Sequence, residues 1–220
     1  MTEVRILLAD DERMVRTALR VILDAEPGLS VVGEAPTGTE AVAAAGALRP
    51  DVVLMDVRMP ELDGIGATER IMAEVPDPPK VVVVTTFEND SFVYDALRAG
   101  AAGFLLKRAA AEELVQAVRL VALGDSLLFP AAVRSLAAGH PERERGRGTA
   151  PAWAARLTER EADVLRLMAT GLTNGEIAGR MGVGPATVKS HVAAVLAKTG
   201  ARHRTQAVIA AYESGFIAPR

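Results

Sequence analysis

Five short apolar runs recur along the first 124 residues, and a segment with helical periodicity follows each of them. Such runs, rich in Val, Ile and Leu and bounded by charged or turn residues, are typical of strands that are buried on both faces. They cover Val4–Ala9, Leu29–Gly33, Asp51–Met55, Lys80–Val84 and Ala102–Leu106. The helical segments cover Glu12–Glu26, Thr39–Leu48, Ile65–Val75, Ser91–Arg98 and Ala111–Leu123. Because alternating strands and helices form βαβ units, the pattern predicts an α/β domain with a doubly wound, five-stranded parallel sheet.

The pattern changes to helices alone from Leu157 onward. Four helices are predicted, over Glu159–Thr170, Asn174–Met181, Pro185–Lys198 and from His203 or Arg204 to Ser214. The second and third are joined only by Gly182-Val183-Gly184, a tight turn that indicates a helix-turn-helix. Residues 137–152 combine Gly, Pro and charged residues without apolar periodicity. We therefore predict a domain over residues 3–124, a linker over 125–154 and a small all-α domain over 155–220.

The charges are divided unevenly between these parts. Residues 1–128 carry 21 Asp and Glu against 12 Lys and Arg, which gives a net charge of −9. Residues 129–156 carry 2 against 5, and residues 157–220 carry 5 against 8, so each of these segments is +3. An acidic front and a basic back favour two domains with different partners, the basic one facing nucleic acid.

The composition excludes several classes of protein. The chain has no cysteine, which rules out disulfide scaffolds, thiolate metal sites and cysteine nucleophiles. No apolar run reaches the roughly 18 residues of a membrane span, and the acidic start Met1–Val4 does not resemble a secretory signal. We expect a cytoplasmic protein without a membrane partner.

A set of polar residues stands at the carboxyl ends of four predicted strands. Asp10 and Asp11 follow the first strand, Asp56 the third, Thr85 the fourth and Lys107 the fifth. In an open parallel sheet these ends meet at one edge, where ligands bind. Close carboxylates repel one another unless a cation lies between them, and oxygen ligands favour Mg²⁺. One aspartate can then act as a nucleophile and form an aspartyl phosphate, with the lysine and the hydroxyl contacting the phosphoryl group.

Each of these residues also has an ordinary structural interpretation. Asp10 and Asp11 can be helix caps, Asp56 a turn residue and Lys107 a solvated loop lysine. Taken singly, each ordinary interpretation is the better one. The order of all of them along the predicted sheet favours the phosphoryl site.

Five motifs lie at these strand ends or beside them, namely Asp10-Asp11, Met55–Pro60, Asp63-Gly64, Thr85-Thr86 and Gly103–Lys107. Together they resemble the receiver domain of bacterial response regulators, a flavodoxin-like fold, over residues 3–123. The resemblance implies that Asp56 accepts a phosphoryl group from a phosphohistidine on a sensor kinase. It also implies Mg²⁺ on Asp11, Asp56 and the backbone carbonyl of Arg58, with Asp10 assisting through water.

The same resemblance implies a switch that senses the phosphate. Thr85 and Lys107 are its expected phosphate contacts, and the small Thr86 leaves access to the aspartate. Phe104, on the last predicted strand, occupies the position of an aromatic residue that moves inward as the threonine hydroxyl turns to the phosphate.

Motifs in the basic part resemble the LuxR-type helix-turn-helix, over residues 155–216. They are Leu157–Glu161, Gly171–Ala178 and Thr187–Val192. The whole chain thus resembles response regulators of the NarL/FixJ type. We expect DNA contacts from the motif and from the start of the last helix, namely from Thr173, Asn174, Thr187, Lys189, Ser190, Ala193, Arg202 and Arg204.

Two departures from the LuxR-type pattern bear on base recognition. Gly184-Pro185 replaces the usual Ser that caps the recognition helix, so that cap is lost or taken over by Thr187. Ala193-Ala194 stands where the family often carries a basic or polar residue. Phosphate contacts and DNA shape would then carry more of the binding.

The leading hypothesis is a transcription factor controlled by phosphorylation, with Mg²⁺ as cofactor and no enzymatic role. Its expected partners are a sensor histidine kinase, double-stranded DNA and a second copy of the chain that joins on phosphorylation, with RNA polymerase as a further candidate. A Mg²⁺-dependent phosphatase would use similar carboxylates but needs an acid–base Asp two residues after the nucleophile, where this chain has Arg58. The third alternative is a DNA-binding protein whose first domain serves only for dimerisation, and the complete acidic set argues against it.

Overall fold

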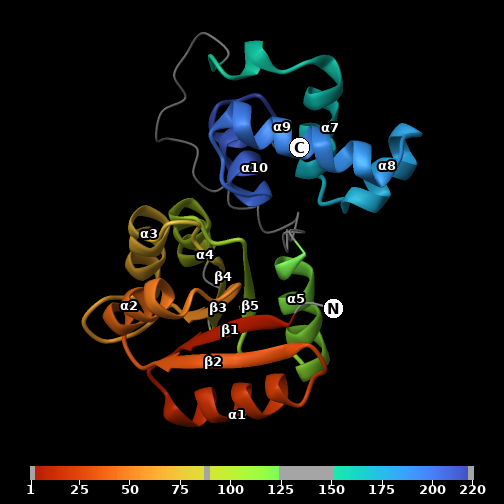
Figure 1. The fold of residues 1–220 in the computed structure, drawn as a ribbon. Coiled ribbons are helices and arrows are strands. Elements are labelled where there is room, and N and C mark those ends of the chain that lie inside the picture. The colour runs from red at the N-terminus through yellow and green to blue at the C-terminus, as the bar shows by residue number, and fades with distance from the viewer. Residues whose placement is uncertain (1–2, 87–89, 124–150, 218–220) are drawn as a thin grey trace. The chain divides into compact units, whose positions relative to one another are not determined.

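The chain forms two compact units, Met1–Leu127 and Leu128–Arg220, in a computed structural model that describes residues 3–86, 90–123 and 151–217 (Figure 1). Most of the predicted linker over residues 125–154 lies outside the described ranges, so the domain limits stay predictions. Within those ranges, no helix has both the length and the apolar character that crossing a bilayer requires.

Unit 1 is a parallel sheet in which a helix follows each strand. Its strands are β1 (Val4–Ala9), β2 (Leu29–Ala35), β3 (Val52–Asp56), β4 (Lys80–Thr85) and β5 (Gly103–Leu106). Its helices are α1 (Arg13–Asp24), α2 (Gly38–Leu48), α3 (Gly64–Glu74), α4 (Asp90–Ala99) and α5 (Ala111–Ala122). The strand order is β2-β1-β3-β4-β5, and every pairing is parallel. The predicted doubly wound, five-stranded sheet is confirmed.

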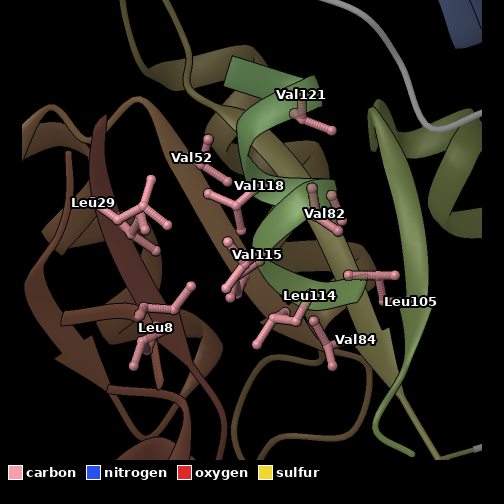
Figure 2. Packing of buried hydrophobic residues seen from close by; sticks show 14 of the residues in the cluster. Leu8, Leu29, Val52, Val82, Val84, Leu105, Leu114, Val115, Val118 and Val121 are labelled. Atoms are coloured by element: carbon pink, nitrogen blue, oxygen red, sulfur yellow. The ribbon is translucent and has the colours of Figure 1, made fainter. Parts of the chain in front are cut away.

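Helices cover both faces of this sheet, which explains why the strands are apolar throughout. Ile6 and Leu8 of β1 belong to the core cluster with residues of α1 and α5, whereas Leu7 between them lies near Leu48 of α2. Figure 2 shows side chains of α5, among them Val118, packed onto the strands. Burial of a Leu, Val or Ile side chain contributes about 1.5–3 kcal/mol, so both layers fix the sheet.

Two strands extend one residue further than the sequence predicted. β3 ends at Asp56 instead of Met55, and β4 ends at Thr85 instead of Val84. Asp56 pairs with Val84, and Thr85 pairs with Leu106 of β5. Both polar residues are therefore held by the sheet ladder itself and do not belong to the loops that follow.

Unit 2 is helical throughout its described part. It contains a short 3₁₀ turn η1 (Ala154–Arg156) and the helices α7 (Glu159–Ala169), α8 (Asn174–Met181), α9 (Pro185–Thr199) and α10 (Arg204–Glu213). Thr158 and Thr173 begin α7 and α8 with capping boxes, each completed by a glutamate three residues on. Gly182 adopts the left-handed φ of 66° that ends α8 and turns the chain into α9. The four predicted helices are all present.

Helix α9 is held by its buried side and by one ion pair. Val188 and Val195 are fully buried, and α9 contacts α7, α8 and α10. At the end of α9, Lys198 Nζ lies 2.6 Å from Oε2 of Glu161, a residue of α7 that is 6% exposed. The same carboxylate completes the capping box of α7. The ion pair therefore ties the end of α9 to the start of α7.

Two glycines allow the loop between β3 and α3 to pack tightly. A Cβ atom on Gly38, the first residue of α2, would overlap with the backbone carbonyl of Leu62 in that loop. A Cβ atom on Gly64, the first residue of α3, would overlap with the backbone carbonyl of Asp56. Gly46, near the end of α2, has no neighbour within 4 Å of such an atom. Gly38 and Gly64 thus set how closely both helices approach the loop after β3.

The substitutions Gly38→Ala and Gly46→Ala should therefore have opposite effects on the stability of unit 1. Gly46→Ala removes an exposed glycine from a helix and should raise the free energy of unfolding by about 0.5–1 kcal/mol. Gly38→Ala forces α2 away from Leu62 and should lower it by about 1–3 kcal/mol. Hydrogen–deuterium exchange of β1 and β3 in the full-length variants measures both. If both substitutions changed the free energy of unfolding in the same direction, the predicted packing would be contradicted.

Candidate functional site

Three carboxylates meet at the carboxyl end of the sheet. Asp56 is the last residue of β3, while Asp10 and Asp11 follow β1, the neighbouring strand. One oxygen of each carboxylate lies within 4.8 Å of the others. Asp10 and Asp56 are 2% and 6% exposed, whereas Asp11 is exposed to solvent. The structure thus brings together the three aspartates that the sequence analysis grouped.

Lys107 supplies a positive charge among these carboxylates. Its Nζ lies 2.8 Å from Oδ2 of Asp10, 3.4 Å from Oδ1 of Asp56 and 3.6 Å from Oε1 of Glu12. Its backbone N–H donates to the carbonyl of Thr85 over 2.7 Å, which extends the pairing of β4 and β5 by one residue. The lysine is therefore fixed both at its backbone and at its ammonium group.

Burial and like charge make the charged form of Asp56 unfavourable. Burial raises the pKa of Asp56 to about 6, and the charge of Asp10 adds to this, while Lys107 opposes it. Burial also lowers the pKa of Lys107, but its hydrogen bond to Asp10 and its attraction to Asp56 more than offset the burial and raise that pKa above its usual value. The ammonium group of Lys107 pairs with the carboxylates of Asp10, Asp56 and Glu12 at once, so it offsets only part of the negative charge gathered there.

The donor set fits a hard divalent cation. Asp10, Asp11 and Asp56 offer carboxylate oxygens close enough to bind one ion, and neither His nor Cys belongs to the cluster. Mg²⁺ prefers such oxygen ligands and is commonly held by one or two carboxylates together with waters. A cation would also relieve the repulsion that raises the pKa of Asp56. Arg58, whose carbonyl was the fourth expected ligand, lies in the loop two residues after Asp56 and is exposed.

Thr85 and Phe104 lie on the same side of the sheet. Val84 and Leu105 pair with each other and belong to the core cluster with α5. Successive side chains of a strand point to opposite faces, so Thr85 and Phe104 point away from that cluster. Thr85 is 4% exposed and Phe104 is half-buried. Thr86, the next residue after β4, is exposed to solvent.

The side of α9 opposite its buried valines is exposed. Four of the predicted DNA-contacting residues lie there with exposed side chains, namely Thr187, Lys189, Ser190 and Ala193. Two further ones, Thr173 at the start of α8 and Arg202 before α10, are also exposed. Gly184 is the N-cap residue of α9 and makes no side-chain cap hydrogen bond, so the usual serine cap is lost at this position.

The structure directs the side chain of Arg204 to contacts within the domain, with Asn174 as one of its partners. Arg204 is 5% exposed, and its guanidinium donates to the carbonyl of Leu172 and, over 3.2 Å, to Oδ1 of Asn174. The side chain of Arg204 is thus directed into the domain, where it joins the start of α10 to the start of α8. We therefore remove Arg204 from the candidate DNA-contacting set. Asn174 remains half-buried at the start of α8, with Oδ1 engaged by this contact.

Two residues that support the site, Gly38 and Arg16, could not be identified from the sequence. Gly38 comes from α2 and touches the loop after Asp56 only in three dimensions, so no local pattern marks it. Arg16 of α1 donates to the backbone carbonyls of Asp10 and Asp11, although its place on a helix is that of an ordinary solvated arginine. The only signal in the sequence was the Asp63-Gly64 motif beside the loop.

The raised pKa of Asp56 predicts a pH-dependent gain in stability for Asp56→Asn without metal. In the folded wild type the proton binds more tightly than in the unfolded chain, so stability is lost as the pH rises through about 6. Asparagine does not titrate. The advantage of the variant in EDTA should therefore grow between pH 4 and pH 8, by about 1–3 kcal/mol. Hydrogen–deuterium exchange of β1 and β3, compared at equal pH, tests this, and an advantage that stays constant or shrinks would contradict it.

Comparisons with known proteins agree with this arrangement of two units. Residues 6–119 match the response regulator receiver domain family, and residues 155–211 match the luxR family of bacterial regulatory proteins. The transcriptional regulatory protein YxjL of Bacillus subtilis is 39% identical over 98% of both chains. The transcriptional regulatory protein LiaR of the same organism is 40% identical over 97% of this chain and 99% of its own length.

Solved structures show the same likeness. The response regulator ChrA of a heme-sensing two-component system is 31% identical, with a TM-score of 0.53 over 99% of this chain and 100% of its own. The receiver domain of the response regulator NarL from Mycobacterium tuberculosis is 36% identical, with a TM-score of 0.54 over 56% of this chain and 99% of its own. A receiver domain joined to a luxR-family domain is the arrangement of a DNA-binding transcriptional response regulator and not of an enzyme, which removes the phosphatase alternative. The chain therefore belongs to the two-component response regulators that join a receiver domain to a LuxR-family DNA-binding domain.

Proposed function

We propose that Asp56 accepts a phosphoryl group from a phosphohistidine of a sensor histidine kinase and that this transfer controls DNA binding by unit 2. The observation that carries the proposal is the position of Asp56. Its buried carboxylate ends β3, with two further carboxylates and Lys107 gathered around it. In such a pocket an oxygen of Asp56 can act as the nucleophile. The other carboxylates suit a cation, and the ammonium group of Lys107 suits the phosphoryl anion.

The transfer makes one bond and breaks one. An oxygen of Asp56 attacks phosphorus, the bond from phosphorus to the imidazole nitrogen breaks, and the nitrogen keeps the electron pair. Lys107, whose Nζ is 3.4 Å from Asp56, provides a fixed positive charge beside the oxygens that the phosphoryl group brings. The burial of Asp56 limits competing contacts with water.

The residues that would hold Mg²⁺ are Asp10, Asp11, Asp56 and the backbone carbonyl of Arg58. When bound, Mg²⁺ offsets the charge of the carboxylates and of the phosphoryl oxygens. Asp10 also keeps Lys107 in place through their 2.8 Å ion pair. The same carboxylate would therefore contact both positive charges of the pocket, the ammonium group of Lys107 and Mg²⁺.

Thr85 and Phe104 transmit the signal. The hydroxyl of Thr85 turns to the phosphate, and the half-buried ring of Phe104 moves inward on the same side of the sheet. The exposed Thr86 leaves the approach to Asp56 open. The phosphate must favour one of two conformations through these contacts, because a group that interacts equally with both shifts nothing.

DNA binding belongs to the exposed side of α9. Lys189 can pair with phosphate or guanine, Thr187 and Ser190 can donate to phosphate, and Ala193 presents a methyl group to the bases. Arg202 and the start of α8, with Thr173 and Asn174, lie beside this helix-turn-helix core. A phosphorylated homodimer would present two copies of α9 to two half-sites, and RNA polymerase is a candidate partner of the bound dimer.

Acetyl phosphate provides a direct test of the acceptor. Full-length protein incubated with acetyl phosphate and Mg²⁺ should gain the mass of one phosphoryl group, and Asp56→Asn should gain none. EDTA should abolish the gain in the wild type. Intact-mass spectrometry gives the result, with peptide mapping after borohydride reduction to locate the adduct.

Two outcomes would contradict this assignment. An adduct on Asp56→Asn would place the acceptor elsewhere. A wild type that stays unmodified both with acetyl phosphate and with phosphorylated histidine kinases would favour a receiver that serves only for dimerisation.

The salt dependence of DNA binding separates contact residues from positioning residues. Lys189→Ala should weaken binding to one fixed random-sequence duplex and lower the slope of log K against log salt by about 1, because one phosphate contact is lost. Arg204→Lys should weaken binding with an unchanged slope, because Arg204 acts inside the domain. Fluorescence anisotropy at several salt concentrations measures both. An unchanged slope for Lys189→Ala, or a reduced one for Arg204→Lys, would contradict these roles.

A further inference from the structure

Arg16 connects the acidic site to the neighbouring strand β2. Its side chain, in the second turn of α1, is only 11% exposed. Its Nη1 donates to the backbone carbonyl of Asp10 over 2.6 Å and to that of Asp11 over 3.2 Å. Its Nε lies 3.1 Å from Oε2 of Glu34, a residue of β2. A single guanidinium thus joins the two site aspartates to a fixed point on the sheet.

The turn that Arg16 contacts is the place where the chain leaves the sheet. The backbone N–H of Asp10 donates to Ala35 of β2, which is the last ladder bond of β1 on that side. The carbonyls of Asp10 and Asp11 come after it, so their orientation depends on groups outside the ladder. The two N–H bonds of Nη1 can serve both carbonyls while Nε donates to Glu34, so the planar guanidinium holds the turn in a fixed geometry relative to β2. Hydrogen bonds from Arg20 and Arg16 also hold the pKa of Glu34 below its usual value, so Glu34 stays charged as the anchor.

We propose that Arg16 is a positioning residue for the cation site, holding the backbone of Asp10 and Asp11 so that both carboxylates point at the position of Mg²⁺. This inference rests on the proposed function, since it concerns the same pocket. Residues that orient metal ligands in this way typically change metal affinity by about 10–100-fold when they are replaced.

Arg20 provides a matched comparison one turn further along α1. Its Nε lies 2.6 Å from Oε1 of Glu34, and its Nη1 donates to the carbonyl of Val31. Within the described part of the chain, Arg20 makes no hydrogen bond or ion pair to Asp10 or Asp11. Replacing either arginine removes one positive charge and one ion pair with Glu34, but only Arg16 holds the turn.

Charge and positioning predict effects of opposite sign. Losing a positive charge near three carboxylates strengthens the attraction for a divalent cation, so an electrostatic role alone makes Mg²⁺ bind more tightly to Arg16→Met. Losing the orientation of the two aspartates makes Mg²⁺ bind more weakly. The direction of the change therefore identifies the role of Arg16.

The experiment is isothermal titration of Mg²⁺ into the full-length wild type, Arg16→Met and Arg20→Met, together with the Mg²⁺-induced rise in unfolding temperature. We expect the Kd of Arg16→Met to rise about tenfold or more and its thermal shift to shrink, while Arg20→Met keeps the wild-type Kd or binds more tightly. If Arg16→Met does not fold, as judged by circular dichroism, Arg16→Lys takes its place. A lysine has one nitrogen in place of Nη1 and Nε, so it cannot hold both carbonyls and Glu34 in the same planar geometry, and the Kd of Arg16→Lys should exceed that of Arg20→Lys.

A Kd for Arg16→Met, or for Arg16→Lys as its substitute, that equals or falls below the wild-type value would overturn the inference. So would an equal loss in the matched Arg20 variant, because the effect would then come from Glu34 and α1 in general. A wild type that binds no Mg²⁺ at all would overturn the metal site of the proposed function and this inference with it. The two failures are therefore distinguishable from one set of titrations.

Discussion

The burial of Asp56 beside the buried Asp10 at one edge of a parallel sheet is the constraint on which the rest of unit 1 depends. The pairing of β1 with β3 brings Asp10 and Asp11 to Asp56, and burial removes much of the water that would screen the charges of Asp10 and Asp56. Lys107 offsets only part of this charge. A cation bound among such carboxylates offsets part of their charge, so the proposed Mg²⁺ has a large effect on the energy of the pocket.

The surrounding elements keep that unfavourable cluster in place. The apolar layers on both faces of the sheet hold the strands, Gly38 and Gly64 let α2 and α3 close on the loop after Asp56, and Arg16 holds the turn after β1. Thr85 belongs to β4 and not to a loop, so a phosphate that engages its hydroxyl acts on the sheet edge beside Phe104. In the proposed function, rigid support of this kind turns the added charge of the phosphoryl group into a change at the surface beside Phe104.

Much of the fold and part of the site could be predicted from the sequence, because both follow from short-range patterns. Apolar runs alternating with helical periodicity indicated the sheet, and the polar residues after four of the five runs indicated the pocket. The role of Arg204 was wrongly expected, because the sequence shows a basic residue at a helix start but not whether its guanidinium points inward to Leu172. Arg16 and Gly38 escaped prediction because their contacts join residues of different elements, which no local pattern records.

Phosphorylation of Asp56 is the proposed control of DNA binding by unit 2. The most direct test compares binding to duplexes selected from a random-sequence pool before and after treatment with acetyl phosphate and Mg²⁺, using wild type and Asp56→Asn. The account predicts tighter binding by the treated wild type, with a shift to the dimer in sedimentation, and no change for Asp56→Asn. An equal gain in the variant, or no gain in a wild type whose phosphoryl adduct is verified by mass, would contradict it.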